Sequence, residues 1–403
     1  MKPFTALLGA AAGSHAADQL ALAALPLTAA LALGANGATI GLLMAAQSAA
    51  WLLVSLPAGA WIDRASRRRL LAGAQAMGMA GALVALIAAE AGMAWLLGLG
   101  AFLSASATVI YVLGSVSILP GLVPAADLPR ANARIELVRA AVSLAAPGVV
   151  GLMAEHASAS WGYAAAALGA AVALACVQRL PTDAPRAGGP APSLFASARA
   201  GVVFVLEHGL LRGIFFCAVF WNFAFFALLA LWVPFALGPL GLGAAGAGAA
   251  QSAYGAGLIA GALAAPLVAR RLPPGATMIF GPASSILAAA ALLTAPRLGD
   301  AIASFGAAAT AHFVVGFGPM LWLIAQTTIR QLVTPAALLG RVNAAVQVAI
   351  YGVRPLGALA GGTLAATSGF DVAIAAVGLT FALSTVAILL SPCARLRAWP
   401  TPV

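Results

Sequence analysis

Two charged side chains interrupt long apolar stretches of this chain, Asp18 near the N-terminus and Arg354 near the C-terminus. Hydrophobic residues make up 63% of the 403 residues, charged residues make up 7%, and the mean hydropathy is +1.03. A charge at the centre of a bilayer costs roughly 2.5–3.5 kcal/mol on insertion scales, so a charge retained there marks a candidate functional site. The composition therefore predicts an integral membrane protein whose few buried polar groups carry its function.

Ser14, His15, Asp18 and Gln19 occur at i, i+1, i+4 and i+5, and on a helix they are predicted to form one polar stripe. Desolvation favours a protonated carboxyl group, whereas a nearby cation favours the carboxylate. Asp18 would therefore bind and release a proton as a cavity beside it opens and closes, and His15 would modulate it. The alternative is a carboxylate held permanently by a hydroxyl group or an arginine.

Arg354 directly precedes Pro355. We interpret it as a counter-charge for Asp18 or as a contact for an anionic substrate; alternatively, backbone carbonyls freed around the proline would satisfy it. Glu136 and Arg139, at i and i+3, are interpreted as an intrahelical ion pair. Aromatic walls suit flat or cationic organic compounds, and the other cavity candidates are Tyr111, Phe215, Asn222, Phe226, His312, Trp322 and Gln326.

Residues that bind cofactors are absent or scattered. The three cysteines form no CxxC pair and the four histidines lie on different segments, so the sequence predicts no disulfide framework and no metal site. Lys2 is the only lysine, which excludes a Walker phosphate loop and a Schiff-base cofactor within the membrane. We therefore expect no cofactor, a proton gradient as the energy source and, because no catalytic groups cluster at one interface, no enzyme activity.

Apolar stretches of about 20 residues recur along the chain, and each could cross a ~30 Å hydrocarbon core as a helix. Unbroken runs rich in Ala, Leu and Gly favour helices over barrel strands. The predicted spans are 5–33 (an uncleaved span rather than a signal peptide), 38–61, 70–91, 94–119, 135–155, 160–179, 211–237, 246–269, 275–295, 302–327, 342–366 and 372–391. The predicted fold class is an all-α polytopic membrane protein with twelve transmembrane helices in two six-helix pseudo-symmetric bundles.

The basic residues indicate the orientation of these spans. Seventeen of the 20 fall on one side when both termini are placed in the cytoplasm, as the positive-inside rule requires. Because they are scattered over short loops, we interpret them as topology signals and expect no nucleic-acid partner. The sequence predicts a multi-pass monomer in a bacterial inner membrane, with the lipid bilayer and a small-molecule substrate as partners.

The chain divides into two halves that resemble each other. Residues 180–198 are rich in Pro, Gly, Ala and Ser, and they predict a cytoplasmic linker followed by an amphipathic segment at 195–210. The predicted domains are a six-helix bundle at 1–180, the linker at 181–210 and a second six-helix bundle at 211–403. Residues 122–133 match 333–344 at seven of twelve positions. Such a repeat predicts a transporter with its site near the midplane between the halves.

One loop carries a recognisable motif. Residues 59–68 read GAWIDRASRR, which resembles the G-x-x-x-D-R-x-G-R-R signature of the major facilitator superfamily, with serine at the second glycine. The ALPL sequence at 24–27, the loop at 333–344 and the stretch 199–212 resemble the efflux branch that includes macrolide exporters and the enterobactin exporter. This resemblance implies a cytoplasmic gate formed by Gly59, Asp63, Arg64, Arg67 and Arg68.

The fifth and eleventh predicted spans contain proline and glycine. Residues 146–151, APGVVG, resemble the G-P-x-x-G motif of proton-coupled antiporters, with alanine at the first glycine. Pro147, Gly148 and Gly151, and likewise Pro355 and Gly357, are predicted to bend these helices and to form a rocking interface, because small residues allow close approach.

Together these features predict a secondary active transporter that exports a small organic molecule, either a siderophore or an amphipathic compound as in multidrug resistance, by proton antiport and alternating access. An importer of the same fold, for a small metabolite or peptide, is the alternative. A non-transporting membrane receptor or enzyme is disfavoured, because the polar residues lie at mid-depth on different spans.

Overall fold

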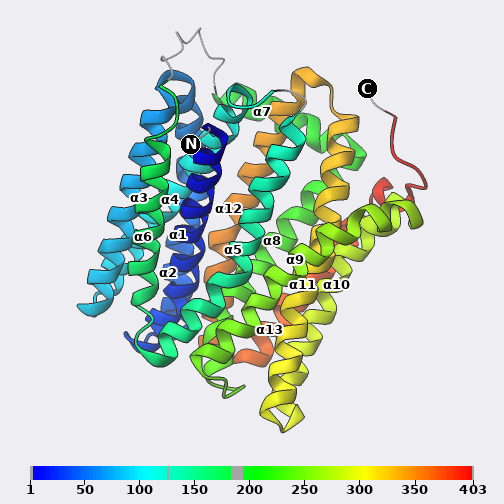
Figure 1. The fold of residues 1–403 in the computed structure, drawn as a ribbon. Helices are drawn as coiled ribbons and strands as arrows, with labels where there is room; N and C mark the ends of the chain where they lie inside the picture. Colours follow the sequence, from blue (N-terminus) through cyan, green and yellow to red (C-terminus); the bar gives the residue numbers. More distant parts are fainter. Residues whose placement is uncertain (1–2, 125–126, 183–193, 402–403) are drawn as a thin grey trace. The chain divides into compact units, whose positions relative to one another are not determined.

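The computed structural model describes residues 3–124, 127–182 and 194–401, and this part of the chain forms α-helices and short 3-10 turns without a β-strand (Figure 1). In lipid, a helix pairs its backbone groups within its own segment, which is why unbroken apolar runs adopt it. The α-helices are α1 (Pro3–Leu31), α2 (Gly37–Arg64), α3 (Arg67–Glu90), α4 (Ala94–Ile118), α5 (Leu128–His156), α6 (Trp161–Val177), α7 (Leu194–Glu207), α8 (Gly209–Leu237), α9 (Ala244–Arg271), α10 (Pro274–Thr294), α11 (Ala301–Val333), α12 (Ala336–Ser368) and α13 (Phe370–Leu389).

Ten of the described helices, α2 to α5 and α8 to α13, are long and apolar enough to cross a membrane. The predicted count of twelve spans is therefore not confirmed. The other two predicted spans, 5–33 and 160–179, coincide with α1 and α6. α6 is apolar but has only 17 residues, and α1 carries the polar segment from Ser14 to Gln19.

Three helices are longer than their apolar cores predict. α5 begins at Leu128 rather than 135, α11 ends at Val333 rather than 327, and α12 begins at Ala336 rather than 342. The added turns contain polar and charged residues, most of which are good helix formers. Hydropathy locates the part of a helix that suits lipid, whereas hydrogen bonding determines where the helix ends.

The turn between α2 and α3 consists of Ala65 and Ser66. The Oγ of Ser66 accepts a hydrogen bond from the backbone N–H of Arg69 at 3.5 Å and caps α3. Ala65 has φ −98° and Ser66 has φ −60°, which are values open to every residue type. The serine that replaces the second glycine of the motif therefore fits this turn.

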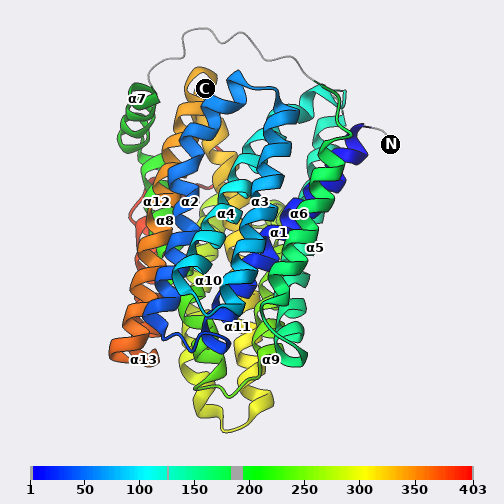
Figure 2. The same ribbon diagram turned by 90° about the vertical axis from the view of Figure 1, so that its left-hand side faces the viewer.

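By compactness the chain divides into two units, Met1–Pro190 with Gly243–Ser252, and Ala191–Leu242 with Ala253–Val403. In the first unit α3 packs against α4 and α6, α1 against α5 and α6, and α2 against α4. Figure 2 shows α2, α4 and α3 running side by side. A Cβ added to Gly81 of α3 would lie 2.7 Å from the backbone nitrogen of Ser104 in α4. Glycine therefore allows these two helices to make backbone contact.

The start of α9 belongs to the first unit, where it packs against the proline-containing part of α5. The Oγ of Ser252 accepts a hydrogen bond from the backbone N–H of Gly148 at 3.0 Å. A Cβ added to Gly151 would lie 2.6 Å from the carbonyl oxygen of Ala244. α5 continues as a helix through Pro147. The predicted motif therefore lies where helix α5 contacts the start of α9.

In the second unit α8 packs against α12 and α13, and α10 packs against α11 and α13. α7 occupies the predicted amphipathic segment and packs against α12. α12 continues through Pro355, and a Cβ on Gly357 would collide with the backbone of Phe223 in α8. A buried cluster in this unit includes Val205, Leu211, Ile214, Met278, Trp322, Ile329, Val342 and Ile388.

Candidate functional site

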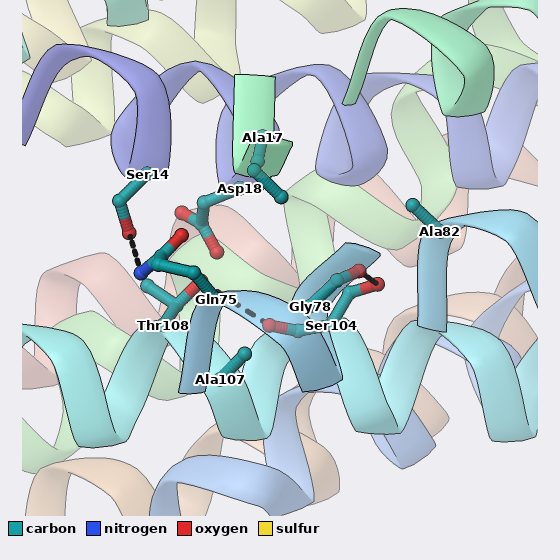
Figure 3. A pocket seen from close by; sticks show the side chains of 10 residues that line it. Ser14, Ala17, Asp18, Gln75, Gly78, Ala82, Ser104, Ala107 and Thr108 are labelled. Atoms are coloured by element: carbon teal, nitrogen blue, oxygen red, sulfur yellow. Dashed lines mark hydrogen bonds between the residues drawn. The ribbon is translucent and has the colours of Figure 1, made fainter. Parts of the chain in front are cut away.

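Asp18 lines a small cavity inside the first unit (Figure 3). Four helices supply the wall, α1, α3, α4 and α6, through Ser14, Ala17, Asp18, Gln75, Gly78, Ala82, Ser104, Ala107, Thr108 and Ala170. The water-accessible volume of the cavity is about 10 Å³, close to what one water molecule needs. Because half of the lining residues are Gly or Ala, the helices approach closely and the polar groups are concentrated in a narrow space.

Hydrogen bonds fix the side chains around Asp18. The Nε2 of Gln19 donates to Oδ2 of Asp18 at 3.0 Å. The Nε2 of Gln75 donates to the Oγ of Ser14 at 3.1 Å, and both of these side chains are buried. Figure 3 shows the Asp18 carboxyl group beside the Gln75 amide and above Thr108 on α4. The carboxyl group thus lies among polar groups from three different helices.

His15 lines a different cavity from Asp18, so the polar residues predicted to form one stripe on α1 are divided between two cavities. Successive helical residues are about 100° apart. Ser14 and Asp18 therefore share one side of α1, while His15 turns toward α4 and α5. The second cavity has a water-accessible volume of about 70 Å³ and is lined by Leu7, Ala11, His15, Tyr111, Val112, Ser115, Val116, Leu119, Asn132, Ile135, Glu136 and Arg139.

The expected intrahelical pair forms on α5 at the edge of this second cavity. The Nη1 of Arg139 donates to Oε1 of Glu136 at 2.8 Å. The Oη of Tyr111 and the Nε of Arg139 are both buried, and neither has a hydrogen-bond partner in the described part of the chain. Two predicted site residues, His15 and Tyr111, therefore line the same cavity as this ion pair, which the sequence analysis interpreted only as a contact within one helix.

Arg354 lies between two aromatic rings in the second unit. Its guanidinium carbon is 4.9 Å from the ring centroid of Phe226 and 4.8 Å from that of Tyr351, distances typical of cation–π contacts. Its Nε donates to Oδ1 of Asn222 at 3.1 Å. The Nδ2 of Asn222 donates to the carbonyl oxygen of Ala218 at 2.9 Å. Three predicted site residues, Asn222, Phe226 and Arg354, therefore meet in one cluster.

The aromatic residues of α8 extend this cluster. Phe225 stacks on Trp221 with ring centroids 5.0 Å apart, and it lies 5.2 Å from the ring of Tyr254 in α9. The Nε1 of Trp221 donates to the Oγ of Ser285 in α10 at 3.0 Å. Arg354 is thus bordered by a wall of aromatic rings that are held in place by neighbouring helices.

The remaining cavity candidates lie elsewhere in the second unit. Trp322 is part of the buried hydrophobic cluster, and Phe215 packs against it. The ring of His312 lies edge-to-face on Trp232 with centroids 4.3 Å apart, and its Nδ1 is 2.9 Å from the carbonyl oxygen of Ala308. Gln326 is buried, and its Nε2 donates to the Oγ1 of Thr327 at 3.0 Å. These contacts hold the interior of the unit together.

The predicted gate residues lie around the turn between α2 and α3. Gly59, Asp63 and Arg64 belong to the end of α2, and their side-chain positions lie outside the described part of the structure. Arg67 and Arg68 form the first turn of α3, and both are partly exposed. Among the described residues, no group of three or more His, Cys, Asp or Glu side chains could hold a metal ion.

Sequence reasoning missed four residues around the predicted ones. Gln75 donates to Ser14 and Tyr351 contacts Arg354, while Asn132 lines the cavity beside His15 and Tyr254 packs against Phe225. Gln75 is the only polar, uncharged side chain of α3 and was therefore detectable. Tyr351 was also detectable, because it lies one helical turn before Arg354 on α12. Tyr254 was not distinguishable from a lipid-facing aromatic residue, and its contact with Phe225 depends on how α8 and α9 pack.

Comparison with solved structures gives the same helical arrangement in several transporters. The nucleoside transporter NupG aligns with a TM-score of 0.74 and 16% identity over 97% of this chain and 100% of its own. A POT family transporter in complex with 5-aminolevulinic acid gives 0.78 and 12%, over 96% of each chain. A bacterial homologue of the human lysosomal transporter Spinster, inward-facing and unoccupied, gives 0.72 and 15%, over 98% of each chain.

At these identities the likeness establishes the fold alone. No curated protein sequence matches the chain. The family model of the Major Facilitator Superfamily matches residues 7–357, from the start of α1 to the proline-containing part of α12. A match over that length, together with the transporter fold, means that this chain belongs to the Major Facilitator Superfamily.

Proposed function

We propose that this transporter exports a small organic molecule from the cytoplasm in exchange for protons, and that Asp18 carries the proton. The observation that carries the proposal is the position of Asp18, an acid inside an apolar helical unit that lines a cavity of about one water molecule. An acidic residue at such a depth is costly and is typical of proton pathways.

The groups around Asp18 suit reversible proton binding. The carboxyl group contacts the Gln19 amide and lies beside the Gln75 amide, and neither amide is ionisable. Amides can donate to a carboxylate or accept from a protonated carboxyl group after a small rotation. Proton exchange at Asp18 therefore requires no change in the charge of these two amides, and one water in the cavity can pass the proton.

The cluster around Arg354 supports an organic cargo. Phe226, Tyr351 and Phe225 offer flat apolar faces, while Arg354 and Asn222 offer polar contacts. Sites for small organic molecules generally combine apolar walls with a few fixed polar groups. A siderophore or an amphipathic drug-like compound has both kinds of surface.

Alternating access completes the proposal. Asp63 and Arg64 would latch a cytoplasmic gate, and the close contacts of Gly148, Gly151 and Gly357 would provide the packed helix surfaces that move as units. The protein would act as a monomer in the bacterial inner membrane with both termini in the cytoplasm.

The test uses purified protein in liposomes with an imposed pH gradient. Ethidium serves as the drug-like probe and enterobactin as the siderophore probe, and proton movement is followed with a pH-sensitive dye. Asp18→Asn is expected to abolish gradient-driven transport of whichever probe the unmodified protein moves. Asp300→Asn is the matched control, because Asp300 caps α11 at its exposed end and asparagine preserves a cap.

Two results would contradict the proposal. Full proton-coupled transport by Asp18→Asn would remove Asp18 from the mechanism. Probe movement in the same direction as the protons, rather than opposite to them, would establish import by symport and exclude the exporter.

A further inference from the structure

The cavity beside His15 contains two hydrogen-bond donors that have no partner among the residues that the structure describes. The Oη of Tyr111 and the Nε of Arg139 are buried and unpaired, and Tyr111 is only 4% exposed. A buried polar group without a partner costs free energy on the order of 1–3 kcal/mol. A cavity that retains two such donors is suited to a ligand that supplies acceptor oxygens.

Most polar groups that line this cavity can donate. Tyr111 and Asn132 each offer a donor, His15 has a ring N–H, and Arg139 has N–H groups beyond the one used by Glu136. Glu136 is the only obligate acceptor in the lining, and it already accepts from Arg139. The surplus of donors favours a ligand with several acceptor lone pairs in one small group, as a carboxylate has.

The charge of Glu136 does not cancel this preference. Its side chain is 66% exposed, against 37% for Arg139, and exposed charges are screened more strongly than buried ones. The exposed ion pair contributes little to stability. The unused Nε of Arg139 is on the buried side, so the cavity presents the donating edge of the guanidinium.

The remaining lining is apolar. Leu7, Ala11, Val112, Leu119 and Ile135 surround the polar residues. The water-accessible volume of about 70 Å³ is several times what one water needs, and it accommodates a carboxylate group together with part of an attached hydrocarbon. The side-chain acceptors in this lining are Glu136, the unprotonated ring nitrogen of His15, and the side-chain oxygens of Ser115, Asn132 and Tyr111.

From these observations we infer that the cavity between α1, α4 and α5 binds the carboxylate end of an amphipathic organic acid. Tyr111 donates through its hydroxyl group and Arg139 through Nε, and the apolar residues hold the hydrocarbon part. This inference goes beyond the proposed function, because it assigns a class of ligand, organic carboxylates, to a second cavity that is separate from the Arg354 cluster.

Benzoate and its neutral isostere benzamide are the probes. Each is titrated into the detergent-solubilised protein, and thermal unfolding is followed with a thiol-reactive dye that reports the cysteines, two of which are buried. A ligand that binds the folded state raises Tm as its concentration rises. Benzoate is expected to raise Tm, and benzamide is expected to bind at least about tenfold more weakly, because it lacks the charge that strengthens hydrogen bonds from buried donors.

Two variants locate the effect. Tyr111→Phe and Arg139→Gln are each expected to weaken benzoate binding by about tenfold, as expected for the loss of one hydrogen bond to a charged group. Arg297→Gln is the matched control, because Arg297 also pairs with an acid, Asp371, at 2.7 Å but in the second unit. Its affinity for benzoate should equal that of the unmodified protein. If Arg139→Gln does not fold, Tyr111→Phe decides the question alone, since it removes only a hydroxyl group.

Equal binding of benzoate and benzamide would overturn the carboxylate assignment, and so would unchanged benzoate binding by Tyr111→Phe. No binding of benzoate to the unmodified protein would overturn it as well. The measurement needs neither a membrane nor a pH gradient. A failure of carboxylate binding is therefore distinguishable from a failure of proton exchange, which only the liposome assay reports.

Discussion

Gly73 and Gly81 lie on the same helix, α3, and the same substitution at each is expected to change stability in opposite directions. A Cβ added to Gly81 would lie 2.7 Å from the backbone nitrogen of Ser104 and 2.9 Å from the carbonyl oxygen of Gly100. A Cβ added to Gly73 would meet nothing within 4 Å, and Gly73 is exposed. Alanine is therefore accommodated at Gly73 and obstructed at Gly81.

The magnitude follows from two opposing effects. Replacing glycine by alanine inside a helix stabilises it by about 0.8–1.0 kcal/mol. Overpacking a closely packed interior costs typically about 1–3 kcal/mol, and at Gly81 the obstacle is backbone, which cannot rotate away. Gly73→Ala should therefore be stabilising by up to about 1 kcal/mol, and Gly81→Ala should be destabilising by up to about 2 kcal/mol after the propensity gain is subtracted.

Thermal unfolding in detergent measures both variants against the unmodified protein. Gly81 is flanked by Gly78 and Ala82, which line the Asp18 cavity, so Gly81→Ala should also reduce pH-driven transport, whereas Gly73→Ala should not. Equal stability of the two variants, or a more stable Gly81→Ala, would refute the close contact of α3 and α4 on which the geometry of the Asp18 cavity depends.

Two further predictions concern the second unit. Arg354→Lys should weaken probe binding by about tenfold while the protein remains folded, because an ammonium group lacks the planar contact that a guanidinium makes with the rings of Phe226 and Tyr351. Equilibrium binding of the transported probe measures the change in affinity. Unchanged affinity would exclude Arg354 from the site. Burial raises the pKa of the Cys393 thiol, so the reactive thiolate forms only at higher pH than in the unfolded chain. Alkylation of Cys393 at pH 8, followed by mass spectrometry, should be several-fold slower in the folded protein than in the unfolded chain. Equal alkylation rates in the two states would show that the thiol of Cys393 is accessible.

Much of the fold could be predicted from the amino-acid pattern. Long apolar runs located all the helices that cross the membrane by length and hydropathy, because lipid leaves a backbone no partner outside its own segment. The helix ends were less predictable, since the polar termini of α5, α11 and α12 remain helical beyond their apolar cores. The twelve-span count was not confirmed, because the polar residues of α1 and the shortness of α6 remove them from a hydropathy count.

The candidate site could be predicted only in its individual members. Asp18, Arg354 and Asn222 were recognisable because polar side chains are costly in apolar helices. That Asn222 and Phe226 meet Arg354 was not recognisable, because these contacts are set by the packing of α12 against α8.

The sequence by itself determined which polar side chains must lie inside apolar surroundings, because a charge or an amide within a long apolar helical segment is placed there by the residues on either side of it. Only the tertiary structure decided which of these groups meet. His15 and Asp18 are three residues apart on α1 and lie on neighbouring positions of its surface, yet the surrounding helices place them in separate cavities, one completed by α3 and α6 and the other by α5. Contacts between helices depend on the rotation of each helix about its axis and on the distance between the packed helices. Neither can be read from the sequence of a single helix.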